Sequence, residues 1–535
     1  MKRALSSGVL AFVLAARAGA AEFDLQNASI ADLQAAMTAG ALSAEQLLAL
    51  YLARIEAYEE QGPTINAIIS QNANALAEAR ALDLERAAKG PRSPLHGIPV
   101  VLKDNIDSAG QPTTGGSMFL AGHMPAQDAF IVKGLRDAGA IILAKVNLGD
   151  FASDATGRSS VSGQTRNPFD PTYTPTGSSG GTGAAVGAWF APLGLGTDTG
   201  GSLRSPTSVN GLAGLKPTTG LLSRGGIIPT CWSFDAAGPM ARSVADVATM
   251  LGPMTGVDAA DADTRVSQGL AHRDYTRFLD AGALRGARIG VVRSPVEAEA
   301  GMNAVFEQAL ADLRAQGAVL VDAVEFPRHV MDSRAALTEV VCDTEVPPDM
   351  ARYLAPLPES YPKSLLDLAA LAAKHLEANP AAAELFPEIY ARYPARMTRM
   401  LTADSRVYRS AREQGLTMAR EAVQGLFEQY QLDAVVYLTR VNLPDRIGPN
   451  VELDSTTLTR LGDSSFRNIA NLTGFPDLTI PAGRNDAGLP VSISLLGPAW
   501  SEPRLLALGF AYEQASRRRF NAKATPPLPG EHIAY

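Results

Sequence analysis

Short runs of apolar residues alternate along the chain with longer segments in which apolar positions recur every three or four residues. The short runs have the length of buried β-strands, and the longer segments have the period of amphipathic helices. Such alternation is typical of a layered α/β fold. The strands expected on this basis are residues 98–102, 140–144, 287–292, 319–324, 433–438 and 491–496, and the expected helices are residues 131–138, 305–315 and 502–516.

An additional helix near the start of the chain is marked by its N-terminal sequence. Ser43 with Gln46 three residues later has the form of a capping box, and apolar residues follow at helical spacing from Leu47 to Ile55. Gly62-Pro63 ends the pattern. We therefore expect the folded domain to begin with helical structure.

Between about residues 337 and 418 the pattern is almost wholly helical and rich in alanine and leucine. Pro347-Pro348 and later prolines are expected to break it into short helices. We interpret the segment as a helical insertion near a substrate entrance. A helical layer packed on the sheet without a functional role explains the pattern equally well.

Residues 1–20 have the form of a cleavable secretion signal. Lys2 and Arg3 precede an apolar centre, and small residues end the segment at Ala18-Gly19-Ala20. We expect cleavage near Ala21 and export to a periplasm or to the medium, with a plain N-terminal helix as the alternative. No later apolar run approaches the roughly 18 residues that a membrane span needs.

Composition narrows the function further. The formal net charge of −8 provides no basic face, so nucleic-acid binding through phosphate neutralisation is not expected. The six histidines are scattered without a pair at metal-ligand spacing, so no metal or other cofactor is expected. Cys231 and Cys342 are either bridged or two separate buried thiols, and the sequence leaves both open.

Two clusters rich in glycine and serine carry the candidate chemistry. The first is Gly-Ser-Ser-Gly-Gly-Thr-Gly at residues 177–183, and the second is Gly-Leu-Gly-Thr-Asp-Thr-Gly-Gly-Ser at residues 194–202. We expect both to be loops in which glycine lets backbone amides approach a ligand. Two glycines before Ser202 gather N–H groups around one point, as a developing oxyanion requires. Ser202 is thus the predicted nucleophile, and the predicted oxyanion donors are the amides of Thr199, Gly200, Gly201 and Ser202.

A serine nucleophile needs a base, and the scattered histidines do not supply one. Lys103 ends the apolar run 98–102, and burial there would lower the pKa of its amine until the neutral form is populated. The alternative for this residue alone is an exposed lysine at a strand end. Together with the two clusters, it is the predicted base.

A rival interpretation uses the first cluster differently. Residues 177–181 match the G-x-S-x-G nucleophile elbow of α/β-hydrolases, which would make Ser179 the nucleophile of an esterase. An elbow follows an apolar strand, whereas residues 170–176 are Asp-Pro-Thr-Tyr-Thr-Pro-Thr. The elbow is therefore disfavoured.

Residues 173–220 resemble the signature of the amidase signature family. The resemblance extends from about Ile30 to Ser243 and resumes at 471–498. One departure is Thr176, where many members have glycine, and it is expected to change the shape of the approach to Ser178. The matching segments are Tyr-Thr-Pro-Thr-Gly-Ser-Ser-Gly-Gly-Thr-Gly, Gly-Thr-Asp-Thr-Gly-Gly-Ser-Leu-Arg-Ser-Pro and Gly-Leu-Lys-Pro-Thr-Thr-Gly.

The resemblance implies a single α/β domain over residues 21–535, with a mixed central sheet covered by helices on both faces. It also implies that Ser202 forms an acyl-enzyme, that Ser178 on a cis peptide bond bridges the serine and the base, and that Lys103 is that base. Ala152 and Ser178 are expected to contact substrate. Asp198 and Arg204 flank Ser202 and are expected to hold its loop by hydrogen bonds.

The implied activity is hydrolysis of a small-molecule or peptide amide to an acid and an amine or ammonia. The N-terminal half is most similar to bacterial peptide and acyl amidases, whose relatives also cleave esters or carbamates. The alternative is the A subunit of an amidotransferase, which releases ammonia from glutamine together with partner chains. The export signal and the acidic charge argue against that alternative, and a monomer or homodimer is expected.

Overall fold

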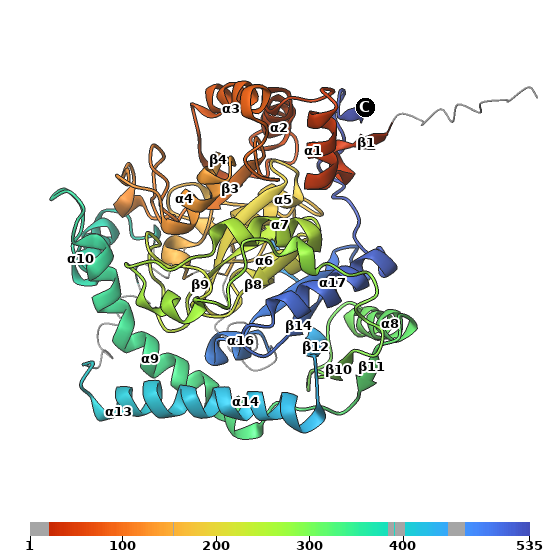
Figure 1. Cartoon of the computed structure of the whole chain (residues 1–535). Coiled ribbons are helices and arrows are strands. Elements are labelled where there is room, and N and C mark those ends of the chain that lie inside the picture. Colours follow the sequence, from red (N-terminus) through yellow and green to blue (C-terminus); the bar gives the residue numbers. More distant parts are fainter. Residues whose placement is uncertain (1–20, 154, 383–389, 391–401, 448–465) are drawn as a thin grey trace, which may run out of the picture.

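An 11-stranded mixed sheet runs through the molecule, with helices packed around it (Figure 1). The computed structural model describes residues 21–153, 155–382, 390, 402–447 and 466–535, so the predicted secretion signal lies outside the described residues. The sheet and its helices confirm the predicted α/β fold. The strand order is β11 (Val319–Val321), β10 (Arg288–Val291), β12 (Ala434–Leu438), β14 (Pro490–Leu496), β13 (Asp477–Arg484), β8 (Ala213–Lys216), β9 (Ala236–Ala241), β7 (Leu193–Asp198), β3 (Pro99–Lys103), β4 (Ile141–Val146) and β2 (Ile68–Gln71).

The centre of the sheet combines parallel and antiparallel pairs. Strand β3 lies between β4 and β7 and is parallel to both, with Leu102 opposite Leu195 of β7. Strand β10 is parallel to β11 and β12, and the other neighbouring pairs are antiparallel. Because β3 and β7 are parallel neighbours, their C-terminal ends lie at the same edge of the sheet.

The hydrophobic pattern located its elements well. Helix α2 (Ala44–Tyr58) begins at the predicted capping box, in which Ser43 Oγ accepts from Gln46 N at 3.1 Å and Ser43 N donates to Gln46 Oε1 at 2.8 Å. The other predicted helices are α4 (Phe130–Asp137), α8 (Met302–Ala315) and α17 (Glu502–Ser516). All six predicted strands are present, as β3, β4, β10, β11, β12 and β14.

The expectation that both glycine clusters are loops was wrong. The first continues into helix α5 (Gly180–Gly187), and most of the second is β7 in the middle of the sheet. Close packing is the reason for the glycines. A Cβ at Gly194 would lie 2.5 Å from Thr182 Cγ2, and one at Gly181 would lie 2.3 Å from the backbone nitrogen of Asn147.

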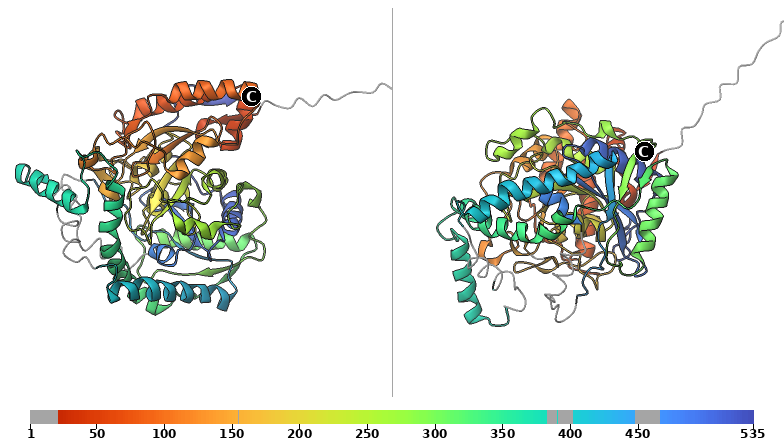
Figure 2. Two further views of the ribbon diagram at one scale, coloured as in Figure 1. Left: turned by 60° about the vertical axis from the view of Figure 1, so that its left-hand side comes forward. Right: turned by 90° about the horizontal axis from the view of Figure 1, so that it is seen from below.

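The helical segment extends further than the sequence pattern indicated. It begins with α9 (Arg328–Leu354), which runs through Pro347-Pro348 without a break, and it ends with α14 (Leu416–Tyr430). The middle of α9 is buried, and this packing outweighs the roughly 3 kcal/mol that a proline costs inside a helix. Between them lie α10 (Leu365–Ala378), which projects from the body in Figure 2, α13 (Arg406–Arg409) and a π-helix (Ser410–Gly415).

The two ends of the described chain lie together. Strand β1 (Glu22–Asp24) pairs antiparallel with β15 (His532–Ala534), beside the label of the C-terminus in Figure 1. Among the described residues, no helix combines the length and apolarity that crossing a bilayer requires. The remaining elements are α1 (Ile30–Thr38), α3 (Ala75–Lys89), α6 (Arg204–Val209), α7 (Val244–Met254), α16 (Arg467–Thr473) and the short pair β5 (Arg158–Ser159) and β6 (Gly163–Gln164).

Candidate active site

Lys103 is the last residue of β3 and is fully buried. Its Nζ donates to Ser178 Oγ at 2.8 Å and to Thr197 Oγ1 at 2.7 Å. Strand β7 supplies Thr197 from beside β3, and the first glycine cluster supplies Ser178. The fold therefore brings the predicted base and the predicted bridging serine into direct contact.

Burial lowers the pKa of Lys103 to about 7, although the charges of Asp198 and Asp235 oppose the shift. A charged amine loses its hydration in this site, and among the described residues no carboxylate lies within ion-pair distance of it. The amine can therefore be neutral near pH 7, as a general base must be.

Two other buried lysines show that burial alone does not make this site. Lys145 pairs with Asp104 at 2.8 Å. Burial also lowers the pKa of Lys216 to about 7, but its Nζ donates to the carbonyls of Pro217 and Phe475, each at 2.9 Å. Of the three, Lys103 is the one whose amine contacts a serine hydroxyl.

The two glycine clusters meet at their serines. The peptide bond between Gly177 and Ser178 is cis. Ser179 N donates to the carbonyl oxygen of Ser202 at 3.0 Å, which joins the first cluster to the end of the second. Ser202 therefore lies directly beside the segment that carries Ser178.

Ser179 does not have the surroundings of a nucleophile elbow. Its hydroxyl donates to the carbonyl of Thr197 at 3.0 Å and accepts from the Thr197 N–H at 3.2 Å. Among the described residues no strand leads directly into Gly177. The hydroxyl instead joins the start of α5 to β7, so the geometry does not support the esterase interpretation.

Asp198 and Arg204 hold the loop between them, as predicted. Arg204 Nε and Nη2 donate to the two carboxylate oxygens of Asp198, each at 3.0 Å, and both side chains are fully buried. Arg204 also donates to Asp477 Oδ2 and Asn471 Oδ1, each at 2.7 Å. Although burial alone would raise the pKa of Asp198, the charge and hydrogen bonds of Arg204 hold it far below its usual range.

Gly201 was predicted to donate its amide to the oxyanion, but in the structure this amide has another partner. Its N–H donates to Asp198 Oδ1 at 2.8 Å, so this amide is engaged with the carboxylate rather than directed at an oxyanion. The predicted donors reduce to Thr199, Gly200 and Ser202. Gly201 also has φ +114°, and a Cβ there would lie 2.7 Å from Arg467 Nε, so the loop requires glycine.

Two segments beside the site have a left-handed backbone. Phe151 and Ala152, the predicted contact to substrate, have φ of 50° and 58°. Thr176, the departure from glycine noted in the sequence, has φ of 58°. Residues other than glycine seldom adopt this conformation, and they do so mainly where the surrounding structure enforces it.

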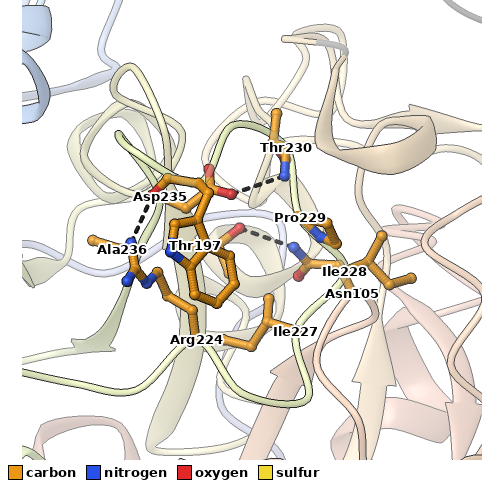
Figure 3. A pocket seen from close by; sticks show the side chains of 10 residues that line it. Asn105, Thr197, Arg224, Ile227, Ile228, Pro229, Thr230, Asp235 and Ala236 are labelled. Carbon is orange, nitrogen blue, oxygen red and sulfur yellow. Dashed lines mark hydrogen bonds between the residues drawn. The ribbon is translucent and has the colours of Figure 1, made fainter. Parts of the chain in front are cut away.

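The sequence did not reveal Asp235, which lies just before β9. Its carboxylate accepts from Thr199 Oγ1 at 2.5 Å and from the N–H groups of Thr230 and Cys231 at 2.8 and 3.0 Å. Figure 3 shows this carboxylate beside Thr230. Asp235 therefore ties residues 228–235 to the loop that precedes Ser202.

Residues 228–235 are tied in turn to α9. Cys231 and Cys342 form a disulfide, which resolves the alternative that the sequence left open. Glu345 of α9 accepts from Ser233 N at 2.9 Å and from Ser233 Oγ at 2.6 Å. Other α9 residues, including Asp349 and Tyr353, line an open groove of about 840 Å³ that also borders this segment. The helical segment thus connects directly to the site.

The described residues contain no group of three or more His, Cys, Asp or Glu side chains arranged to hold a metal ion.

Comparison with known proteins finds similarity to amidases over most of the chain. The family model described as Amidase matches residues 46–506. The chain is 31% identical over 510 residues to a probable amidase from Arabidopsis thaliana, covering 92% of this chain and 91% of the relative. It is also 35% identical over 496 residues to the A subunit of glutamyl-tRNA(Gln) amidotransferase from Chloroflexus aurantiacus, covering 92% and 97% of the two chains.

Among solved structures, the chain is similar to native peptide amidase from Stenotrophomonas maltophilia. The TM-score is 0.84 at 38% identity, and the match covers 94% of this chain and 99% of that one.

Proposed function

This chain belongs to the amidase family and is an amide-hydrolysing enzyme. On that premise we propose that it cleaves peptide or acyl amides through an acyl-enzyme on Ser202. The observation that carries the proposal is the 2.8 Å contact between Ser178 Oγ and the buried amine of Lys103.

In the proposed first half-reaction, Ser202 Oγ attacks the carbonyl carbon of the amide. Its proton passes to Ser178 Oγ, and the proton of Ser178 passes to the neutral Lys103 amine. The oxyanion that forms accepts hydrogen bonds from the amides of Thr199, Gly200 and Ser202. The C–N bond then breaks, the leaving nitrogen takes a proton from Ser178, and Lys103 returns one to Ser178.

In the second half-reaction, water takes the place of Ser202 as nucleophile. It attacks the acyl carbon, loses its proton through Ser178 to Lys103, and releases the acid as Ser202 recovers its hydrogen. The net reaction is an amide plus water giving an acid and an amine or ammonia. Lys103 ends the cycle neutral, and the chemistry uses no cofactor.

Substitution of the proposed residues tests this mechanism. Ser202→Ala is expected to abolish both amide hydrolysis and labelling by a serine-directed phosphonate, and Lys103→Ala to leave only slow residual activity. Ser179→Ala, at the neighbour of Ser178 in the first cluster, is the matched comparison. Full activity in Ser202→Ala would refute the mechanism. Activity lost in Ser179→Ala alone would favour the nucleophile-elbow interpretation, in which Ser179 is the nucleophile.

A substrate panel tests the substrate class. C-terminal peptide amides, anilides, fatty amides, carbamates and esters are assayed with the same enzyme preparation. Similarity to the Stenotrophomonas maltophilia peptide amidase supports peptide amides as the best substrates. Turnover confined to esters would contradict the proposal.

The second candidate is glutamine hydrolysis in the manner of an amidotransferase, which the similarity to the Chloroflexus aurantiacus protein favours. Ammonia release from free glutamine separates the two functions. The purified chain is expected to hydrolyse peptide amides without a partner and to leave glutamine intact. Glutamine cleavage that depends on partner chains would select the second candidate.

A further inference from the structure

Thr197 lies between the proposed base and a second polar side chain. Its Oγ1 accepts from Lys103 Nζ at 2.7 Å and from Asn105 Nδ2 at 3.2 Å, and Figure 3 shows the Asn105 contact. Lys103 and Asn105 are at most 1% exposed, and Thr197 is 6% exposed. The three groups therefore depend on one another for hydrogen bonds.

The chemistry of a neutral amine makes the direction of these bonds important. A neutral lysine has two N–H groups and one lone pair, and only the lone pair can take the proton of Ser178. A threonine hydroxyl has one O–H donor and two acceptor positions. If Thr197 turned its O–H toward Lys103, it would occupy the lone pair and remove the base from Ser178.

Asn105 and Thr197 also line a small cavity, together with Arg224, Thr230, Asp235 and apolar residues (Figure 3). Its volume is about 10 Å³, and a cavity of roughly 10–15 Å³ can hold one water. Asn105 Oδ1 has no hydrogen-bond partner in the part of the chain that the structure describes. A water in this cavity can accept the Thr197 O–H and donate to Asn105 Oδ1.

The opposite orientation of the Asn105 amide leads to the same result. In that orientation the side-chain oxygen accepts the Thr197 O–H directly. With either orientation, the Thr197 hydroxyl donates its hydrogen to the cavity water or to Asn105. Its oxygen is then only an acceptor toward Lys103.

We propose that Asn105 and Thr197 are positioning residues that hold the lone pair of Lys103 on Ser178, and that the cavity beside them is a water site. The proposal rests on the proposed function, because it takes Lys103 as the base. The cavity shares the wall residues Arg224, Ile227, Pro229 and Trp232 with the open groove of about 840 Å³, so it lies next to that groove.

The test compares Thr197→Val, Thr197→Ser and Asn105→Asp in the full-length enzyme, using kcat, KM and the pH profile of kcat/KM. Thr197→Val is expected to lower the plateau kcat roughly 10- to 100-fold, because correct proton transfer contributes about 10²–10⁴-fold. Thr197→Ser, which retains the hydroxyl, is expected to recover kcat to within about threefold. KM should stay nearly constant, since neither side chain is assigned a contact with substrate.

The pH profile distinguishes positioning from a merely structural role. The charged groups that act on Lys103 are Asp198 of β7 and Asp235 before β9. Thr197→Val removes an acceptor of the ammonium form and should move the acid limb to lower pH. Asn105→Asp adds a nearby negative charge and should move it to higher pH.

Thermal unfolding of each variant identifies any loss of kcat that comes from misfolding. Thr197→Ser and Thr197→Val are then compared with each other, because they differ in the hydroxyl at the same position. Equal plateau kcat in that pair, or acid limbs that do not shift in opposite directions, would overturn the inference. Ser202→Ala is measured in the same series. Retained activity there would refute the proposed function instead, so the two failures are distinguishable.

Discussion

The chemistry at the residue scale depends on where three similar lysines are placed. Lys103, Lys145 and Lys216 are all fully buried, but one contacts hydroxyls, one pairs with a carboxylate and one donates to backbone carbonyls. Burial lowers the pKa of an amine that has only neutral oxygens within hydrogen-bond distance, so such an amine can lose its proton. The surroundings of Lys103 therefore make it suitable as a base.

The pH dependence of activity follows from this placement. Burial lowers the pKa of Lys103 to about 7, so kcat/KM should fall as pH decreases through about 7, where the amine becomes protonated. Steady-state kinetics between pH 5 and 9 on an uncharged amide measures the acid limb. Lys216→Met is the control, because Lys216 has the same lowered pKa without a serine contact. If the acid limb moves in Lys216→Met, the titration belongs to Lys216 and its assignment to Lys103 is wrong.

Arg204 is the residue on which the Ser202 loop depends for stability. Arg204→Met removes the cation between Asp198 and Asp477 and leaves two buried carboxylates without it. Breaking a buried pair in this way costs about 3–5 kcal/mol, and we expect a loss of that size in the free energy of unfolding. Urea denaturation of wild type and variant measures it.

Arg293 supplies the matched control, because it pairs with Glu307 at the surface and its side chain is 47% exposed. Arg293→Met should change the free energy of unfolding by less than about 1 kcal/mol. Similar losses in both variants would show that the Asp198–Arg204 pair does not have the stabilising role assigned to it.

At the scale of elements, α9 connects the helical segment to the site. The Cys231–Cys342 disulfide and the Glu345–Ser233 hydrogen bonds hold residues 228–235 against α9. The Asp235 carboxylate then holds Thr199, next to the nucleophile loop. The helical segment therefore contributes to the geometry of the site through this short connection.

The Cys231→Ser/Cys342→Ser double variant tests the connection. The wild-type disulfide joins residues 111 positions apart in sequence. We expect the double variant, which lacks it, to lose about 2–4 kcal/mol in the free energy of unfolding. A decrease in kcat should accompany it, because Asp235 belongs to the released segment. Reductant should reproduce both effects in the wild type and have none on the double variant. Unchanged stability and kcat would show that the disulfide is dispensable.

The whole molecule brings together the two ends of the described chain. Strand β1 pairs with β15, and Arg54 of α2 forms a buried ion pair with Glu531 at 2.7 Å. Cleavage near Ala21 would leave β1 intact. The disulfide is of the kind that persists in oxidising compartments. The disulfide, and a predicted cleavage point that precedes β1, support our proposal that the protein is exported, to a periplasm or to the medium.

Export is tested by expressing the full chain in a bacterium with two membranes and fractionating the cells. The protein in the periplasmic fraction should have an N-terminus near Ala21 by mass spectrometry. A variant with Lys2 and Arg3 changed to glutamate is the control, since it removes the positive start of the signal and should remain uncleaved. An uncleaved, cytoplasmic wild-type chain would contradict the proposal.

The sequence by itself determined which segments form strands and helices wherever hydrophobic periodicity is strong, as in β3, β4 and α17. It also determined the family and the candidate serines and lysine, because the glycine-serine pattern is specific. It misassigned the two glycine clusters and the limits of the helical segment. Glycine in a packed interior and glycine in a loop have the same local sequence, and buried packing can carry a helix through two prolines.

Only the tertiary structure decided which polar groups meet. Lys103 and Thr197 lie on adjacent strands but 94 residues apart in sequence, and Asp235 and Thr199 are 36 residues apart. Cys231 and Cys342 come together because α9 packs against residues 228–235. Pairings of this kind depend on strand order and helix packing, which no local pattern contains. The sequence named the groups that can react, and the fold set the neighbours that determine their protonation and direction.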